Sequence, residues 1–160
     1  RVLAAVMPGP ILTEYESAVR SAGYEPGAVL PSSLAALAAV DPMEAILAAN
    51  LSAHAMTTTI ANGHDLLLYR ALDLPADPRQ RIAEIQRGIA VASAYYEDKL
   101  GSRPRAIHYA GSQSPADFAY CVGDPSLSVV DWVPKPDEGA LTSLPQTSFA
   151  GVAGALAGAS

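Results

Sequence analysis

The chain has 160 residues, which is enough for one domain with an appendage. Its 10 Lys and Arg residues stand against 16 Asp and Glu residues, and this net charge of −6, without any basic run, argues against nucleic-acid binding. Cys121 is the only cysteine, so an internal disulfide is excluded, and no apolar run reaches the ~18 residues of a transmembrane helix. With 50% hydrophobic residues, the chain is expected to fold around a buried core.

The first part of the chain, residues 1–40, predicts a leading βα unit and a short helix. Residues 1–7 form a continuous apolar run, which is typical of a strand covered on both faces. After a Pro-Gly-Pro turn, apolar residues at helical spacing predict an amphipathic helix that ends at Gly23. Ser32 or Ser33 is expected to cap the short helix. Because the chain does not begin with methionine, we expect it to be a fragment of a longer protein.

The next three runs, residues 45–51, 55–61 and 66–72, predict an antiparallel meander of strands. The middle run contains a β-branched cluster of three threonines and an isoleucine, which favours a strand. Asn62-Gly63 lies between the second and third runs and is the strongest hairpin turn signal in the chain. We therefore expect a tight turn there and no helix within residues 45–72.

A long amphipathic helix is predicted between Asp77 and Gly101. Asp77 precedes a proline, as an N-cap residue often does, and Gly101 is suited to end the helix. An apolar stripe recurs at steps of three and four and is expected to face the sheet. Its members are Ile82, Ile85, Ile89, Ala92 or Ser93, Tyr96 and Leu100.

The remaining residues predict alternating strands and helices. Strands are expected at 106–110 and 127–130, a helix at 116–122, and a small-residue helix at 149–159 after a proline-containing loop. A three-strand meander followed by alternating helices and strands predicts an α/β fold with a mixed sheet and helices on its faces. We expect residues 41–160 to form this subdomain.

A family resemblance follows from these elements. Over residues 45–72, an apolar strand, a short polar turn, a threonine-bearing strand and an Asn-Gly turn resemble the phosphate-loop hairpin of the actin-like (ribonuclease H-like) superfamily. The long helix, the next strand and Gly111-Ser112 resemble that superfamily's adenosine-contacting segment. Residues 2–24 and the C-terminal small-residue helix look like PilM-type pilus assembly proteins, and FtsA-like division proteins are similar in outline. The resemblance implies a ribonuclease H-like, actin-like subdomain with an antiparallel three-strand meander and additional parallel strands. It also implies that the leading unit of residues 1–40 belongs to a neighbouring subdomain of the parent protein.

The resemblance also implies a degenerate nucleotide site. Where the family has an aspartate this sequence has Asn50, a neutral amide that cannot replace a carboxylate in organising Mg²⁺ near phosphates. Where the family has a glycine it has Ser52, whose side chain enters the space that a phosphate would approach. The residues that fall on the two loops are Asn50, Ser52, His54, Thr57, Gly111 and Ser112. No catalytic residue, metal ligand or resident cofactor is expected, and any ATP and Mg²⁺ would belong to the full-length parent.

Several of these residues also have a purely structural interpretation. Asn50 and Ser52 fit a pair of turn residues, and residues 111–114 fit the cap of the helix that follows. His54 fits a solvent-facing side chain, and Cys121 fits an inert, buried thiol. The residue types alone do not decide between the structural and the nucleotide-binding interpretation.

Three functions are compatible with the sequence. The resemblance favours a PilM-like cytoplasmic scaffold of a type IV pilus or related secretion system, peripheral to the inner membrane and bound to inner-membrane proteins of that machine. One alternative is an ATP-binding actin-fold enzyme, an ATPase or sugar kinase, and Asn50 argues against it because phosphoryl transfer needs a carboxylate there. The other is an unrelated α/β ligand-binding domain, which the strand order would reveal. The apolar residues 1–23 further suggest a homodimer.

Overall fold

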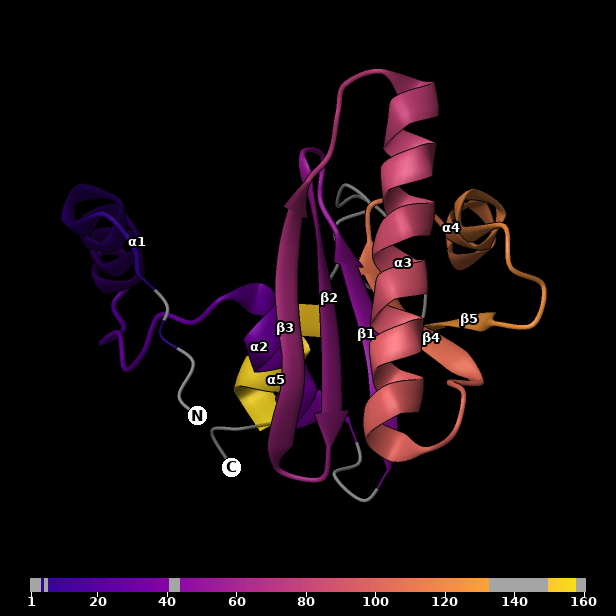
Figure 1. The fold of residues 1–160 in the computed structure, drawn as a ribbon. Coiled ribbons are helices and arrows are strands. Elements are labelled where there is room, and N and C mark those ends of the chain that lie inside the picture. Colours follow the sequence, from indigo (N-terminus) through magenta and orange to yellow (C-terminus); the bar gives the residue numbers. More distant parts are fainter. Residues whose placement is uncertain (1–3, 5, 41–43, 133–149, 158–160) are drawn as a thin grey trace, which may run out of the picture.

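The computed structural model describes residues 4, 6–40, 44–132 and 150–157. Its centre is a five-stranded sheet in the order β3-β2-β1-β4-β5, with helices on both faces (Figure 1). The strands are β1 (Ala45–Leu51), β2 (Ala55–Asn62), β3 (Asp65–Asp73), β4 (Ala106–Gly111) and β5 (Ser128–Asp131).

The sheet is mixed, as predicted. β2 pairs antiparallel with both β1 and β3, whereas β1, β4 and β5 run parallel to one another. The predicted meander is therefore confirmed, and no helix interrupts residues 45–72. The fold is α/β, with an antiparallel meander at one side of the sheet and parallel strands at the other.

The tight turn between β2 and β3 lies one residue later than the sequence indicated. Asn62 is the last residue of β2 and pairs with Asp65, so the two turn residues are Gly63 and His64. Gly63 has a φ of +61°, and a glycine with positive φ at the first turn position suits a type II′ hairpin. The Asn-Gly signal predicted the hairpin correctly, but the positive-φ position is the first of the two turn residues.

The long helix α3 (Pro78–Leu100) covers one face of the sheet. The Asp77 carboxylate accepts a hydrogen bond from the Gln80 amide at 2.9 Å, and Gly101 ends the helix with a φ of +68°. The predicted stripe is confirmed, although Ile82 and Leu100 at its ends are only half-buried. The buried residues of α3 are Ile85, Gly88, Ile89, Ala92 and Tyr96.

Gly88 is a member of this buried stripe that the apolar pattern did not identify. A Cβ at this position would lie 2.6 Å from Met56 Cε and 2.8 Å from Leu72 Cδ1. The glycine therefore lets α3 approach β2 and β3 closely.

Helix α4 (Pro115–Val122) lies on the same face of the sheet as α3. Ser114 Oγ accepts a hydrogen bond from the Asp117 amide at 3.1 Å, which caps the helix. The Phe118 ring stacks on the Tyr109 ring, with centroids 4.3 Å apart. These two rings join α4 to the core beneath α3.

The opposite face carries α2 (Ser32–Ala35), the 3₁₀ helix η1 (Ala36–Ala39) and α5 (Ala150–Ala157). The predicted serine cap is wrong, because Pro31 occupies the N-cap position and both serines lie inside α2. Ser33 is buried instead, with its hydroxyl 2.9 Å from that of Tyr69. The small-residue helix is confirmed, and a Cβ at Gly154 would overlap the Ala35 carbonyl.

The N-terminal helix α1 (Gly9–Ser21) forms as predicted but stands apart from the sheet (Figure 1). None of its residues is buried. The strand predicted over residues 1–7 is not found in its described residues: Ala4, Val6 and Met7 are exposed coil, and Val6 is 95% exposed. An apolar run becomes a strand only where a neighbouring strand pairs with it, and no described strand does so here. The expected boundary at residue 40 stays a prediction.

Candidate functional site

The predicted nucleotide loops meet at one edge of the sheet. Since β1 and β4 are parallel neighbours, Asn50 lies opposite Ala110 and Leu51 lies opposite Gly111. The β1–β2 turn with Ser52 therefore lies beside the loop that follows β4. The carboxyl ends of parallel strands are where open α/β sheets usually place their ligands.

Asn50 and Thr57 lie on the face of the sheet that carries α2 and α5. They oppose each other across β1 and β2, and their neighbours Leu51 and Met56 pack into the core on the α3 face. Asn50 Nδ2 donates a hydrogen bond to Ser32 Oγ at 3.3 Å. The amide thus joins the sheet to α2.

The β1–β2 turn is closed by its own serine. The Ser52 amide donates to the Ala55 carbonyl at 2.9 Å, and the Ser52 hydroxyl donates to the same oxygen at 3.1 Å. Ser52 Oγ in turn accepts from the amides of His54 at 3.4 Å and Ala55 at 3.0 Å. These are the kinds of backbone donor that a glycine-containing phosphate loop leaves free. Here the serine hydroxyl is the acceptor.

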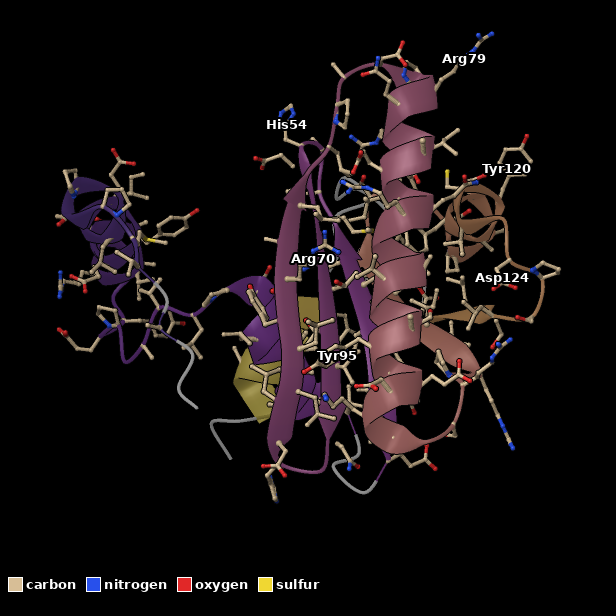
Figure 2. The ribbon with its side chains drawn as sticks, viewed as in Figure 1. His54, Arg70, Arg79, Tyr95, Tyr120 and Asp124 are labelled. Atoms are coloured by element: carbon tan, nitrogen blue, oxygen red, sulfur yellow. The ribbon has the colours of Figure 1, made fainter. Side chains whose placement is uncertain are left out.

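Arg81 lies near the beginning of α3, and its side chain is hydrogen-bonded to the β1–β2 turn. Its guanidinium donates to the Ala53 carbonyl at 2.7 Å and to the Ser52 carbonyl at 3.0 Å. Figure 2 shows His54 at the tip of the turn and Arg79 directed away from it into solvent. The sequence analysis missed Arg81, because nothing in the local pattern indicates that an exposed helical arginine reaches a turn 28 residues earlier in the chain.

On the β4 side, Gly111 makes room for Tyr109. A Cβ at Gly111 would overlap the Tyr109 hydroxyl and lie 2.9 Å from the Leu51 carbonyl oxygen. Tyr109 is only 2% exposed, and burial raises the pKa of Tyr109 to about 12. The phenol is therefore neutral at physiological pH, and it fills the space beneath the loop.

The loop after β4 caps α4 through Ser114, which confirms the structural interpretation for that residue. Ser112 is exposed, and no hydrogen bond joins its side chain to any described residue. Gln113 Oε1 and the Tyr109 hydroxyl are buried without a hydrogen-bond partner among the described residues. The loop therefore holds two unsatisfied polar atoms next to a capped helix.

Two of the carboxylates at this edge of the sheet take part in helix caps, whereas Asp73 and Asp131, at the ends of β3 and β5, are exposed. Asp77 caps α3, and the Asp117 carboxylate accepts a hydrogen bond from the Ser114 hydroxyl at 2.7 Å. Among the described residues, no group of three or more His, Cys, Asp and Glu side chains is placed to hold a metal ion. The arrangement offers hydrogen-bond donors and acceptors, and the exposed carboxylates of Asp73 and Asp131 have no hydrogen-bond or ion-pair partner among the described residues.

The remaining titratable candidates, His108 and Cys121, are each half-buried in the fold. His108 is half-buried on the α2 and α5 face, and burial lowers its pKa, which keeps the ring neutral. Cys121 is half-buried in α4, and burial raises the pKa of its thiol, which keeps it protonated and poorly reactive. No helix within the described part of the chain is both long and apolar enough to cross a membrane.

Comparison with known proteins bears on the fold. No family model matches the chain, and no curated protein matches it in sequence. The structure is similar to a chain of the PilM-PilN type IV pilus biogenesis complex, with a TM-score of 0.62 and 17% identity, over 93% of this chain and 58% of that one. The chain therefore shares the mixed-sheet α/β fold of that neighbour. It spans little more than half the length of this neighbour.

A second structure shows a much lower similarity. The ROK hexokinase from Thermus thermophilus aligns with a TM-score of 0.37 and 14% identity, over 55% of this chain and 34% of that chain. A superposition of that quality carries no argument about this molecule. The alternative of an α/β ligand-binding domain stays a prediction, because a similarity at 17% identity concerns the fold alone.

Proposed function

We propose that this protein is a PilM-like assembly scaffold of a type IV pilus or related secretion system. It would lie in the cytoplasm, peripheral to the inner membrane, and bind inner-membrane proteins of the machine. The proposal is supported by the similarity to a chain of a pilus biogenesis complex over 93% of this chain. It is also supported by the closed β1–β2 turn.

The closed turn is the observation that carries the proposal. In an actin-like fold, a working phosphate loop needs free backbone amides and a carboxylate near the metal. Here Ser52 Oγ is bonded to the amides of His54 and Ala55, Arg81 holds the turn's carbonyls, and Asn50 stands in place of the aspartate. Nucleotide binding is then weak or lost, and the fold serves to present surfaces to other proteins.

An ATP-binding actin-fold enzyme is the second candidate, because Asn50, Ser52 and Gly111 gather at the same edge of the sheet. Calorimetric titration with Mg²⁺-ATP separates the two candidates. We expect no binding and no hydrolysis by the wild-type chain. Ser52→Gly, which frees two backbone amides, is expected to gain measurable affinity, whereas Ser112→Gly in the exposed loop is not. Steady ATP turnover by the wild type that is lost on changing Asn50 would establish the enzyme instead.

The scaffold role is tested in the source bacterium. Deletion of the gene is expected to abolish surface pili, counted by electron microscopy, and wild-type protein should restore them. Asn50→Ala protein should restore them equally, since the role does not depend on nucleotide. Chemical crosslinking in cells should join the protein to inner-membrane components of the pilus or secretion machine. Normal piliation in the deletion strain, without such crosslinks, would contradict the proposal.

A further inference from the structure

The outer edge of β3 is a long, open strand edge. Among the described residues, β3 pairs only with β2, so the backbone groups along its other side have no strand partner. The strand has 9 residues, whereas β5 at the opposite edge has only 4. Proteins usually protect their edges by keeping strands short or by placing charges along them, because an open edge can pair with another chain. β5 is short in this way, whereas β3 is long, although it carries charged residues and one register shift in its pairing with β2.

The side chains of β3 are mostly apolar. Within residues 65–70, Asp65 is the one acidic residue and Arg70 is the one basic residue. Leu66 is 37% exposed beside the edge. Arg70 Nη1 is buried without a hydrogen-bond partner, and no described carboxylate forms an ion pair with this guanidinium. Asp65 is exposed, and it too has no ion-pair or hydrogen-bond partner among the described residues. The edge thus offers one unpaired cation and one unpaired anion.

Both charged residues lie on the α3 face of the sheet. Asp65 opposes Asn62 and Arg70 opposes Thr58, and these two residues share a face with the core residue Ile60. Five positions along a regular strand would put the two residues on opposite faces. The register shift between Ile60 and Ala61 adds one residue to β3 and brings them to the same face. Figure 2 shows Arg70 beside the middle of β3.

We propose that β3 pairs antiparallel with β3 of a second copy of this chain. A twofold axis at Leu67 and Leu68 places Arg70 of each copy opposite Asp65 of the partner subunit, and Leu66 opposite Tyr69 of the partner subunit. Opposite charges and an aliphatic–aromatic contact are favourable cross-strand pairs. The unsatisfied guanidinium of Arg70 gains a carboxylate in this way. The inference does not depend on the pilus assignment.

The charges also select the register. An antiparallel ladder centred on Arg70 keeps the same faces aligned but places two guanidinium groups side by side, and like charges directly opposed are destabilising. The ladder centred on Leu67 and Leu68 forms two ion pairs instead. An edge contact buries less area than the ~1,200 Å² typical of stable interfaces, so we expect a dissociation constant in the micromolar range. Salt should weaken the dimer because it screens the two ion pairs.

Sedimentation of the whole chain tests this pairing at protein concentrations from about 1 µM to about 1 mM. The wild type is expected to change from monomer to dimer across this range. Arg70→Asp and Asp65→Arg should each remain monomeric, because each opposes like charges across the axis. An equimolar mixture of the two variants should form a heterodimer, and the double variant should again form a homodimer. Asp73→Arg, which lies outside the paired stretch, should dimerise as the wild type does.

Rescue on mixing separates a true pairing from a folding defect, since a misfolded variant gains no partner. A wild-type chain that stays monomeric at every concentration would overturn the proposal. So would a wild-type dimer that survives both single charge changes. A dimer abolished by Ile11→Asp but unaffected by Arg70→Asp would belong to α1 and would overturn it as well.

Discussion

Helices α1 and α3 have similar sequence patterns and very different surroundings. Both carry an apolar stripe at helical spacing, and both begin with a proline in the first turn. Ile85 in α3 is 1% exposed, whereas Ile11 in α1 is 43% exposed and no residue of α1 is buried. Periodicity therefore predicts that a helix forms and which of its faces is apolar. It does not predict whether another element covers that face.

The N-terminal ends of α1 and α3 also differ, because only α3 has a side-chain cap. Asp77 caps α3 with its side chain, while the N-cap residue of α1, Pro8, offers no side-chain bond. A helix of 13 residues, none of them buried, is marginally stable in water. The body around α3 should therefore unfold cooperatively, and α1 should melt independently and earlier.

The largest expected effect distinguishes the two apolar stripes directly. Ile85→Ala should lower the free energy of unfolding by roughly 2–5 kcal/mol, because it leaves a cavity beneath α3. Ile11→Ala removes the same atoms from an exposed site and should change the free energy of unfolding by less than about 0.5 kcal/mol. Urea unfolding followed by tryptophan fluorescence measures both. Equal losses in the two variants would mean that α1 is packed after all.

A second change tests the close contact of α5 with α2. Gly154→Ala should destabilise the body by about 1–3 kcal/mol, because its Cβ overlaps the Ala35 carbonyl and α5 must move away. Gly9→Ala in α1 is the matched control, since nothing lies within 4 Å of a Cβ placed there. The control should leave the urea midpoint unchanged and raise helicity slightly. A neutral Gly154→Ala variant would show that α5 is not docked closely.

A third change concerns the β1–β2 turn. Ser52→Ala removes the hydroxyl that bonds the turn's amides, and it should cost about 1 kcal/mol. Hydrogen exchange should accelerate at the amides of His54 and Ala55 and remain unchanged in the middle of β1. Ser112→Ala, in the exposed loop after β4, should alter neither rate nor stability. Unchanged protection at His54 and Ala55 would mean that the serine does not hold the turn.

The smallest expected effect lies in α1. Glu16 and Arg20 form an i,i+4 pair at 3.4 Å, and exposed helical pairs of this kind contribute about 0.3–0.5 kcal/mol. Glu16→Gln should lower helicity in far-ultraviolet circular dichroism at low salt without moving the cooperative unfolding midpoint. A shifted midpoint would show that α1 and the body unfold together.

The sequence predicted the elements whose signals are local. The threonine cluster and Asn-Gly indicated the meander, and Asp77, the apolar stripe and Gly101 bounded α3 correctly. Gly88 was missed because its role comes from Met56 and Leu72, which lie on other elements. The strand over residues 1–7 was wrong in its described part because a strand depends on a neighbour, which no local pattern supplies.

The sequence placed the candidate residues on two loops but did not predict the contacts that hold them. Asn50, Ser52 and Gly111 lie at one edge of the sheet because β1 pairs in parallel with β4. Arg81 and the Tyr109 hydroxyl were not anticipated, since both reach the site through tertiary contacts. Whether the predicted loop residues bind a nucleotide stays a prediction that the calorimetric experiment addresses.

The bond between Arg81 and the β1–β2 turn has a mechanical consequence. Two guanidinium hydrogen bonds join the turn to the first turns of α3, a helix of 23 residues and about 35 Å. A force on the turn must either break both bonds or carry the beginning of the helix with it. Because Ile85, Ile89 and Tyr96 hold α3 against the sheet, the helix cannot follow the turn without breaking its own packing. A load on the β1–β2 turn is thus resisted by the contacts of the whole helix and not by the turn alone.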